Sequence, residues 1–542
     1  MWRADVLAEA RSHRPAPGFR VLLRNPSAVA LVTAGLLSAF YLWLQPRAPD
    51  LAAQLARADA VRYGGVSSWW TGWFGGLSLP SYSFFVPWLM AALGAQTAGI
   101  VAVFIGSVGV AQLSHAALRP RATAIAFAAA AAADLADGRV TFTVGLSMGV
   151  CALLALRPGH RILGAGLTVL TYAASPLAGL FLGIVLLACL YCDRARLGQL
   201  APSVLLLLVT AGATAILFPG TGTMPYSLLT DWPAVMSCVG LIAVCRCREI
   251  RATAALLLVA MLILLVYPGA VGDNITRLAW ACAVPATVAS VPMRARTVGL
   301  IAVLLSIWPL TDLGGQLRAA SGPSAQAAFY QSVAAEVRVQ QRLAGSVAVG
   351  GRTEVIDSTD HYASVYLAPL GLARGWDRQA DRANNPIFYL PGQLTTGSYR
   401  AWLSQLAVRW IALPDRPLDY ASQAEARLVR AGLPYLHLIW SSHRWRLYEV
   451  IDPTPLVSGA MVKSVSSGTI AIAVVAGVTA TVRTRWSPYL LTVDPITHQP
   501  VSSCLTNVYG WVQLIPERSG IIEVTSHFLP ARRWTPIDSD CG

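Results

Sequence analysis

Long apolar runs separated by short polar segments fill the chain from residue 27 to residue 313. Such runs are typical of membrane-spanning helices, because a helix needs about 20 mostly apolar residues to cross the hydrocarbon core. Several of the runs are shorter than that. We expect about eleven spans, at 27–44, 97–114, 122–135, 140–156, 162–174, 177–192, 202–218, 233–245, 252–267, 278–292 and 297–311.

The first two runs are separated by a long polar loop, residues 45–96. A loop of this length is uncommon unless it is functional or disordered. It offers two carboxylates, Asp50 and Asp59, as candidate catalytic groups. Its candidate sugar-binding rings are Trp69, Trp70, Trp73 and Tyr82. Tryptophan and tyrosine are equally typical of anchors at a membrane interface, so both interpretations of the rings stay open.

The pattern changes after residue 313, where helix-like and strand-like periods alternate and no convincing span follows. Ala327–Leu343 has the period of an amphipathic helix and Val408–Leu413 that of a strand. From residue 457 onward β-branched strands dominate, for example at Gly520–Ser526. The fold class predicted is therefore an α-helical polytopic membrane domain, residues 27–313, followed by an α/β domain, 314–456, and a β-rich domain, 457–542.

The arginines predict the orientation of the chain. With residues 1–26 in the cytoplasm, the segments expected on the inside hold sixteen arginines. The outside loops before the C-terminal domains hold five, Arg47, Arg57, Arg62, Arg139 and Arg277. Cytoplasmic loops of membrane proteins are enriched in arginine and lysine, so we expect a multi-pass protein of the plasma membrane with both C-terminal domains outside.

Composition supports this class. Of the 542 residues, 55% are hydrophobic and 13% are charged, which is far too apolar for a soluble multi-domain protein. The net charge of +14 comes largely from arginines in the short loops, so we expect membrane lipid and not nucleic acid as the partner. The first apolar run is long enough to remain in the bilayer as a signal anchor.

Two of the nine cysteines, Cys504 and Cys541, fall in the region expected outside the cell. An oxidising compartment favours disulfides, and these two form the predicted pair. The other seven lie in or beside the predicted spans.

Two outer hairpins place charges at the ends of spans. Asp137 and Arg139 belong to the first, and Asn274 and Arg277 to the second. Charges at this depth are costly unless they pair, reach the interface or line a cavity. An arginine lining a cavity would suit a lipid phosphate, whereas the structural alternative is an ion pair or an interfacial anchor.

The densest polar segment of the C-terminal half is residues 373–389. Its candidates for binding a sugar or an acceptor are Arg374, Trp376, Asp377, Arg378 and Gln379. Planar hydrogen-bonding groups beside an aromatic face suit polyols. A salt-bridged surface that docks onto the membrane domain is an equal alternative.

The order of several motifs along the chain resembles a known family. WWTGWFGG and YSFFVPW follow the first acidic residue, and DGRVTFTVG, SPLAGLF, GDNITRL and ARGWDRQADRANNPIFY come later. This order resembles actinobacterial polytopic envelope proteins of the GT-C glycosyltransferase type, some of whose relatives carry the label 6-pyruvoyl-tetrahydropterin-synthase-related membrane proteins. The resemblance covers most of the chain.

The resemblance implies a transferase that uses a polyprenyl-phosphate sugar as donor and an envelope glycan or glycolipid as acceptor, at the outer face of the plasma membrane. It also implies a catalytic acid in the first outer loop, where Asp50 is the best match and Asp59 the second. The chain departs from the family pattern because that loop lacks a pair of adjacent acidic residues. A divalent cation stays open. The alternatives are a transporter or flippase for an envelope lipid or saccharide, and a non-catalytic protein of envelope assembly.

Overall fold

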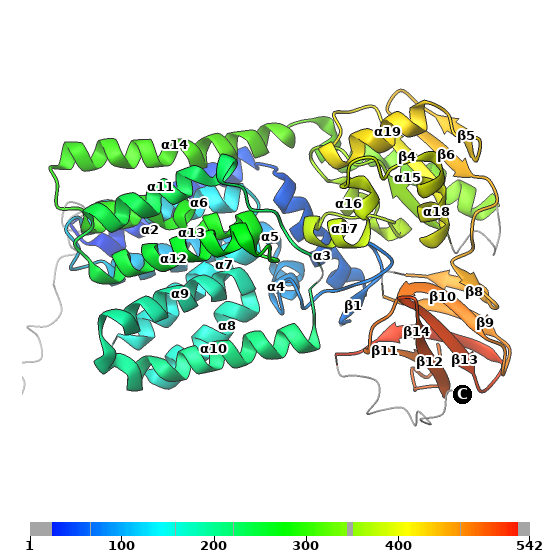
Figure 1. The fold of residues 1–542 in the computed structure, drawn as a ribbon, viewed down its shortest axis with the longest axis horizontal. Helices are drawn as coiled ribbons and strands as arrows, with labels where there is room; N and C mark the ends of the chain where they lie inside the picture. Colours follow the sequence, from blue (N-terminus) through cyan, green and yellow to red (C-terminus); the bar gives the residue numbers. More distant parts are fainter. Residues whose placement is uncertain are drawn as a thin grey trace, which may run out of the picture.

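The computed structural model describes residues 24–64, 67–157, 159–220, 222–343, 351–466 and 468–528. A bundle of helices occupies one end of the molecule, and an α/β domain and a β-sandwich lie side by side at the other (Figure 1). The helices of the bundle are α2 Pro26–Leu44, α5 Ala95–Leu113, α6 Pro120–Ala136, α7 Val140–Leu156, α8 Arg161–Ala174, α9 Pro176–Cys192, α10 Leu197–Leu217, α11 Leu228–Val244, α12 Arg248–Val266, α13 Arg277–Ser290 and α14 Ala295–Ala319.

A helix lies at each of the predicted apolar runs. In the described part of the chain, five segments are long and apolar enough to cross a membrane: α2, α5, residues 194–217, α12 and α14. Helices α7, α8, α9 and α11 are apolar but shorter. The structure therefore supports a membrane protein, while the count of eleven spans stays a prediction.

Local signals in the sequence place the starts of these helices. Asn25 accepts a hydrogen bond from the Ser27 amide and Pro26 occupies the first turn of α2. Ser175 caps α9 in the same way, with Pro176 in its first turn. Proline is tolerated there because the amides of the first turn have no partner within the helix.

The first outer loop is largely ordered into short elements. It contains α3 Pro49–Gly64, the hairpin strands β1 Trp69–Trp70 and β2 Leu77–Ser78, and α4 Val86–Leu93. Helix α3 has no apolar stripe of large residues, but five alanines give it high helix propensity. The small side chains let it lie between two larger bodies, the bundle and the α/β domain.

The α/β domain is built on a four-stranded sheet of order β3-β4-β6-β5. Strand β3 pairs with β4 in parallel and the other pairs are antiparallel. The strands are β3 Arg352–Val355, β4 Val408–Pro414, β5 Leu436–Ser441 and β6 Trp445–Val450. The helices are α15 Ala327–Leu343, α16 Ala363–Tyr366, α17 Arg378–Asn384, α18 Thr396–Gln405 and α19 Gln423–Arg430.

The β-rich region is a sandwich of two antiparallel sheets, of order β12-β13-β10-β7 and β11-β14-β9-β8. Alternate residues of its strands point into the shared core, among them Ile472, Val482 and Leu514. The strands are β7 Val457–Ser458, β8 Met461–Val465, β9 Ile470–Val474, β10 Ala480–Arg485, β11 Leu490–Val493, β12 Ser503–Val508, β13 Trp511–Pro516 and β14 Gly520–Ser526.

The sandwich is attached to the bundle at the C-terminal end of α10. The Tyr489 hydroxyl donates to the Leu217 carbonyl at 2.5 Å, and the Tyr489 ring stacks on Phe218 with centroids 5.0 Å apart. Thr484 donates to the Gly75 carbonyl of the first outer loop at 2.9 Å. These contacts join three segments that are far apart in the sequence.

The predicted disulfide involves one residue that the structure describes. Cys504 is disulfide-bonded, whereas Cys541 lies outside the described residues, so the pairing stays a prediction. The seven cysteines of the bundle are free.

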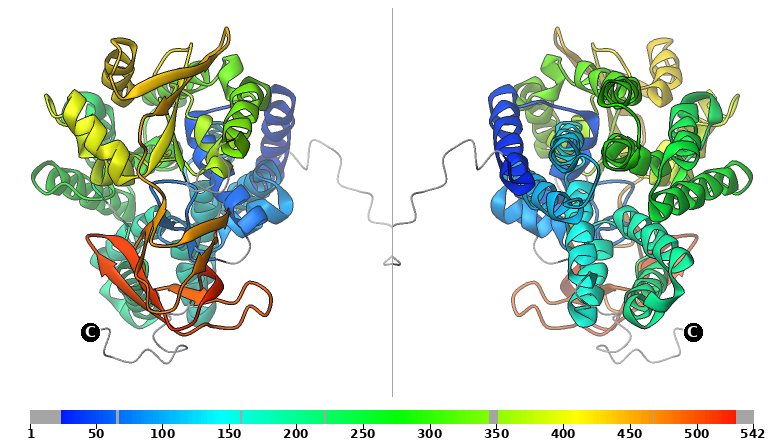
Figure 2. Two further views of the ribbon diagram at one scale, coloured as in Figure 1. Left: turned by 90° about the vertical axis from the view of Figure 1, so that its right-hand side faces the viewer. Right: turned by 90° about the vertical axis from the view of Figure 1, so that its left-hand side faces the viewer.

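The arginine-rich connections all lie at the end of the bundle remote from the C-terminal domains (Figures 1 and 2). Arg119 donates to the Val291 carbonyl at 3.0 Å and Arg161 to the Gly198 carbonyl at 3.3 Å, so loops distant in sequence meet there. This clustering is the asymmetry expected if that end faces the cytoplasm.

The orientation predicts the behaviour of fusion proteins. A reporter that is active only in the cytoplasm should be active when fused after Gly198 and silent when fused after Gly542. The measurement is reporter activity in intact cells, normalised to the amount of each fusion. Activity after Gly542 would contradict the orientation.

Candidate functional site

Asp50 lies in the first turn of α3, where a carboxylate is favoured by the unpaired amides of the helix N-terminus. Its Oδ2 accepts a hydrogen bond from Arg277 Nη2 at 3.0 Å and lies 3.4 Å from Arg139 Nε. The three residues come from α3, from the turn before α7 and from the start of α13. The structure thus brings together one predicted base and both predicted phosphate-binding arginines.

A glycine permits this convergence. Gly138 has φ +82°, a conformation that favours glycine, and a Cβ atom there would lie 2.3 Å from the Leu51 amide nitrogen. The turn that carries Arg139 can therefore press directly against the start of α3. Any side chain at position 138 would separate Arg139 from Asp50.

Arg139 is surrounded by carboxylates in addition to Asp50. It lies 2.6 Å from Asp137, 3.5 Å from Asp134 and 3.6 Å from Asp312, and its guanidinium sits 5.2 Å from the Trp280 ring centroid. A buried charge is tolerated when it is paired in this way. This geometry matches the alternative in which Arg139 forms a structural ion pair and does not bind a phosphate. Asp137 is the carboxylate partner that lies nearest to it.

Arg277 is less fully occupied. Among the described residues its side chain pairs with Asp50 alone, and 18% of it is exposed. Asn274 lies one turn earlier in the 3₁₀ helix η3, Gly272–Thr276, beside Asp273. Burial raises the pKa of Asp273 to about 6, although Arg277 opposes the shift. Because Arg277 pairs with a single carboxylate, it has further N–H groups that could donate hydrogen bonds to a phosphate.

Asp59 lies elsewhere. It is nine residues beyond Asp50 on α3, about 13 Å along the helix axis. Its side chain is 40% exposed and lies 3.7 Å from Arg62, and no contact with Arg139 or Arg277 is found in the described part of the chain. The structure separates the two candidate bases.

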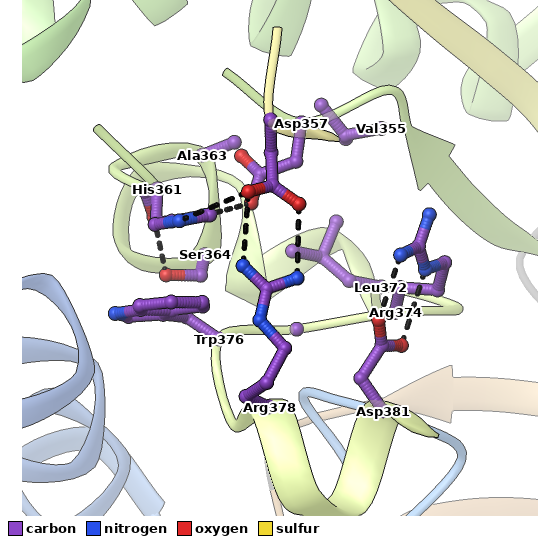
Figure 3. A pocket seen from close by; sticks show the side chains of 12 residues that line it. Val355, Asp357, His361, Ala363, Ser364, Leu372, Arg374, Trp376, Arg378 and Asp381 are labelled. Carbon is purple, nitrogen blue, oxygen red and sulfur yellow. Dashed lines mark hydrogen bonds and ion pairs between the residues drawn. The ribbon is translucent and has the colours of Figure 1, made fainter. Parts of the chain in front are cut away.

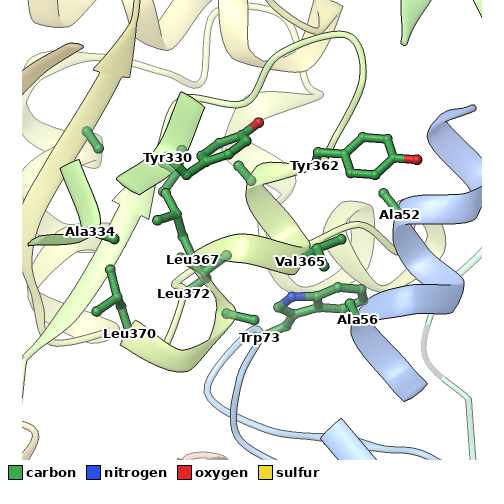
Figure 4. Packing of buried hydrophobic residues seen from close by; sticks show 14 of the residues in the cluster. Ala52, Ala56, Trp73, Tyr330, Ala334, Tyr362, Val365, Leu367, Leu370 and Leu372 are labelled. Atoms are coloured by element: carbon green, nitrogen blue, oxygen red, sulfur yellow. The ribbon is translucent and has the colours of Figure 1, made fainter. Parts of the chain in front are cut away.

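The aromatic rings of the first outer loop are mostly buried. Trp73 is fully buried, its Nε1 donates to the Ser364 carbonyl at 3.0 Å, and Trp70 packs beside it (Figure 4). A Cβ atom on Gly375 would lie 2.3 Å from the Trp73 ring, so glycine allows that segment to cover the indole. Trp69 packs against the core of the sandwich. These three rings hold domains together, and Trp70 and Trp73 present no open face to a sugar.

Tyr82 is also engaged in packing. The Arg57 guanidinium lies 3.9 Å from the Tyr82 ring centroid, and Gln54 donates to the Tyr82 hydroxyl at 2.5 Å. Its side chain is only half-buried, so part of the ring remains accessible.

The polar segment 373–389 contacts the first outer loop and the bundle. Asp377 pairs with Arg57 at 2.7 Å, and Trp376 Nε1 donates to the Pro49 carbonyl at 2.8 Å, one residue before Asp50. Gln379 donates to the Ala270 carbonyl at 3.3 Å. These contacts match the alternative prediction for this segment, in which it docks onto the membrane domain and does not bind a sugar.

A small cavity lies beside this segment (Figure 3). The Trp376 ring stacks on His361 at 3.4 Å, and Arg378 donates two hydrogen bonds to Asp419, each 2.9 Å. Burial alone would raise the pKa of Asp419, but its bonds with Arg378 hold that pKa below the usual value. The cavity measures about 20 Å³, room for about one water and not for a sugar.

Arg374 is buried in a second ionic cluster. It pairs with Asp381 at 2.6 Å and Glu425 at 3.3 Å, and lies 3.9 Å from Glu354. Burial raises the pKa of Glu354 well above its usual range, and the charge of Glu425 adds to the shift. Neither carboxylate oxygen of Glu354 has a hydrogen-bond partner among the residues that the structure describes. Arg374 thus stabilises the domain and is closed to ligands.

Two members of the Asp50 site were not anticipated from the sequence. Asp312 lies near the outer end of α14 and Trp280 in the first turn of α13. Asp312 could have been identified from the sequence, because, like Arg139, it is a charged residue at the end of an apolar run. Within the described residues, no group of three histidine, cysteine, aspartate or glutamate side chains is arranged so that it could hold a metal ion.

These features indicate a membrane protein with a charged site close to where its helix bundle meets the α/β domain. No known family matches the sequence, and no curated protein matches it. A solved structure of a mutant of the arabinofuranosyltransferase AftD from mycobacteria aligns with 85% of this chain and 43% of that chain, at 15% identity and a TM-score of 0.43. The chain spans less than half of that protein, and a likeness this weak carries no argument about function.

Glu354 predicts a pH-dependent stability. A carboxylic acid whose pKa is higher in the folded chain than the usual 4.5 stabilises the fold below pH 4.5, and this stabilisation is lost as the pH rises toward the folded pKa. The loss is up to about 1.4 kcal/mol for each pH unit. Glu354→Gln should therefore raise the melting temperature relative to the parent by an amount that grows with pH above 4.5.

The measurement is thermal unfolding of the detergent-solubilised protein between pH 4.5 and 8. Glu517→Gln is the matched control, because Glu517 is exposed and the same charge is removed. A constant difference between Glu354→Gln and the parent at every pH would contradict the prediction.

Proposed function

We propose that the protein is a membrane glycosyltransferase that moves a sugar from a polyprenyl-phosphate donor to an envelope glycan or glycolipid at the outer face of the plasma membrane. The observation that carries the proposal is the convergence of Asp50, Arg277 and Arg139 at the junction of bundle and domains. A carboxylate beside a partly free arginine is the pair of groups that such a transfer requires.

Asp50 acts as the general base in this proposal. An acceptor hydroxyl attacks the anomeric carbon, a carbon–oxygen bond forms, and Asp50 takes the hydroxyl proton. The bond from the anomeric carbon to the phosphate oxygen breaks, and the lipid phosphate leaves with the electron pair. Arg277, one of whose nitrogens lies 3.0 Å from Asp50, stabilises the charge on the departing phosphate.

The distribution of charge favours Arg277 over Arg139 as the phosphate ligand. Four carboxylates lie within 4 Å of Arg139, namely Asp50, Asp134, Asp137 and Asp312. A phosphate would meet their repulsion there, because like charges at short distance are unfavourable. Arg277 and the half-buried Asn274 face fewer acids, and a divalent cation at the site would offset part of the negative excess.

Trp376 and Arg378 are the remaining candidates for holding the acceptor. Trp376 is half-buried and donates a hydrogen bond to the carbonyl next to Asp50, whereas the Arg378 side chain is 11% exposed and is paired with Asp419. An acceptor bound along this segment would place its hydroxyl on the side of α3 that carries the proposed base. The α/β domain would thus contribute to acceptor binding.

Asp50→Asn tests the proposal. Asparagine keeps the size and polarity of the side chain but does not take a proton, so the transfer rate should fall about 10²- to 10⁴-fold with donor binding preserved. The assay is sugar transfer from a polyprenyl-phosphate donor to envelope glycan by purified protein. Arg277→Ala should instead raise the KM for the donor.

Asp59→Asn is the matched control, because it makes the same change on the same helix at an exposed position. If Asp59→Asn loses activity and Asp50→Asn does not, the base is Asp59. If both transfer sugar at the parental rate, the enzyme proposal fails, and transport or a non-catalytic role in envelope assembly takes its place.

A further inference from the structure

A second, larger cavity of about 610 Å³ lies inside the helix bundle. Its walls come from α5, α6, α7, α9, α12 and α13 and are almost entirely apolar, with Phe127, Leu153, Phe181 and Ile250 among them. A space of this volume lined by hydrocarbon side chains suits an apolar ligand, since water there would lack polar partners.

The cavity is elongated along the bundle. Helix α13 lines it from Leu278 to Ser290, a distance of about 18 Å at 1.5 Å per residue. That is more than half of the roughly 30 Å thickness of a bilayer core. The shape therefore suits a single hydrocarbon chain that lies parallel to the helices.

Two arginines stand at one end of the cavity. Arg157 and Arg246 both line it, and both are exposed. Arg157 Nη1 donates to the Gln112 carbonyl at 3.2 Å, which holds its guanidinium at the mouth. The Arg246 amide donates to the Ser290 carbonyl at 3.3 Å. Neither arginine forms an ion pair with a carboxylate among the described residues.

The surroundings add to the positive charge. The connections at this end carry eleven arginines against two acids, Asp193 and Glu249. The arginines are Arg119, Arg121, Arg157, Arg161, Arg194, Arg196, Arg246, Arg248, Arg251, Arg294 and Arg296. An apolar channel with an uncompensated cationic mouth is complementary to an anionic amphiphile.

We propose that this cavity binds an anionic phospholipid of the leaflet at the arginine-rich end, with one acyl chain along α13 and the headgroup phosphate between Arg157 and Arg246. A polyprenyl phosphate with its phosphate at Arg277 would enter from the Leu278 end of the cavity and would leave Arg157 and Arg246 without a phosphate, so the two lipids differ in their dependence on these arginines. The lipid site does not rest on the proposed function. Asp50→Asn should therefore retain the phospholipid whether or not it abolishes transfer.

The test is native mass spectrometry of the full-length protein in a neutral detergent, titrated with phosphatidylglycerol or with phosphatidylcholine of the same acyl chains. The parent should bind one phosphatidylglycerol tightly and prefer it over phosphatidylcholine. An arginine at a membrane surface changes anionic-lipid affinity about fivefold, so Arg157→Gln with Arg246→Gln should weaken binding on the order of 25-fold. Arg194→Gln with Arg296→Gln is the control, because both arginines are exposed at the same end but do not line the cavity.

A second variant tests the apolar part of the site. Ala286 is half-buried on α13 and lines the cavity, so Ala286→Phe should fill it and lower the affinity for both phospholipids. Folding of each variant is checked by its melting temperature and elution volume. If Ala286→Phe misfolds, the two arginine pairs still decide the question.

Three results would overturn the proposal. The first is parental affinity for phosphatidylglycerol in the Arg157 and Arg246 double variant. The second is an equal loss in the Arg194 and Arg296 control, which would show general surface attraction only. The third is displacement of the bound phospholipid by an equimolar amount of polyprenyl phosphate, with the same dependence on Arg157 and Arg246.

Discussion

The burial of one charge, the Arg57 guanidinium, fixes how the parts of this protein meet. The side chain is 1% exposed, and a charge removed from water is tolerated only when it is paired and hydrogen-bonded. Its partners are Asp377 of the α/β domain, the Ala53 carbonyl of its own helix and the rings of Trp73 and Tyr82. Any relative movement of α3, the tryptophan loop and α17 would leave this charge uncompensated.

The position of Asp50 depends on that packing around Arg57. It lies two turns before Arg57 on the same helix, and the Trp376 indole holds the preceding carbonyl. On its other side Gly138 admits the turn that brings Arg139, while α13 supplies Arg277. The charged groups of the site therefore all come from the bundle and its first loop, and the α/β domain helps to hold α3 in place through the Trp376 hydrogen bond.

Sequence periodicity predicted the elements that a single segment can specify. Each apolar run coincides with a helix, and α15 and β14 begin and end at the predicted residues. Strands β5 and β6 were missed because their burial does not alternate cleanly along the chain. Helix α3 was missed because small alanines, and not a stripe of large apolar residues, form its buried face.

The site was predictable in part for the same reason. Charges at the ends of apolar runs marked Asp50, Arg139 and Arg277, and the structure brings those three together. Asp312 adds a fourth carboxylate around Arg139 through a contact across more than 170 residues of chain, which no local pattern records. Burial of Trp70, Trp73 and Arg374 likewise depends on how the domains pack.

The alanine face of α3 also limits how this protein can change over evolution. Ala52 and Ala56 are almost completely buried against the α/β domain (Figure 4). Leu51 and Ala58 of the same helix pack into the bundle. A larger side chain at positions 52 or 56 would act as a wedge between the two bodies, because packed interiors yield little to added volume. Positions 52 and 56 should therefore tolerate less substitution than the exposed Arg62 and Tyr63 of the same helix.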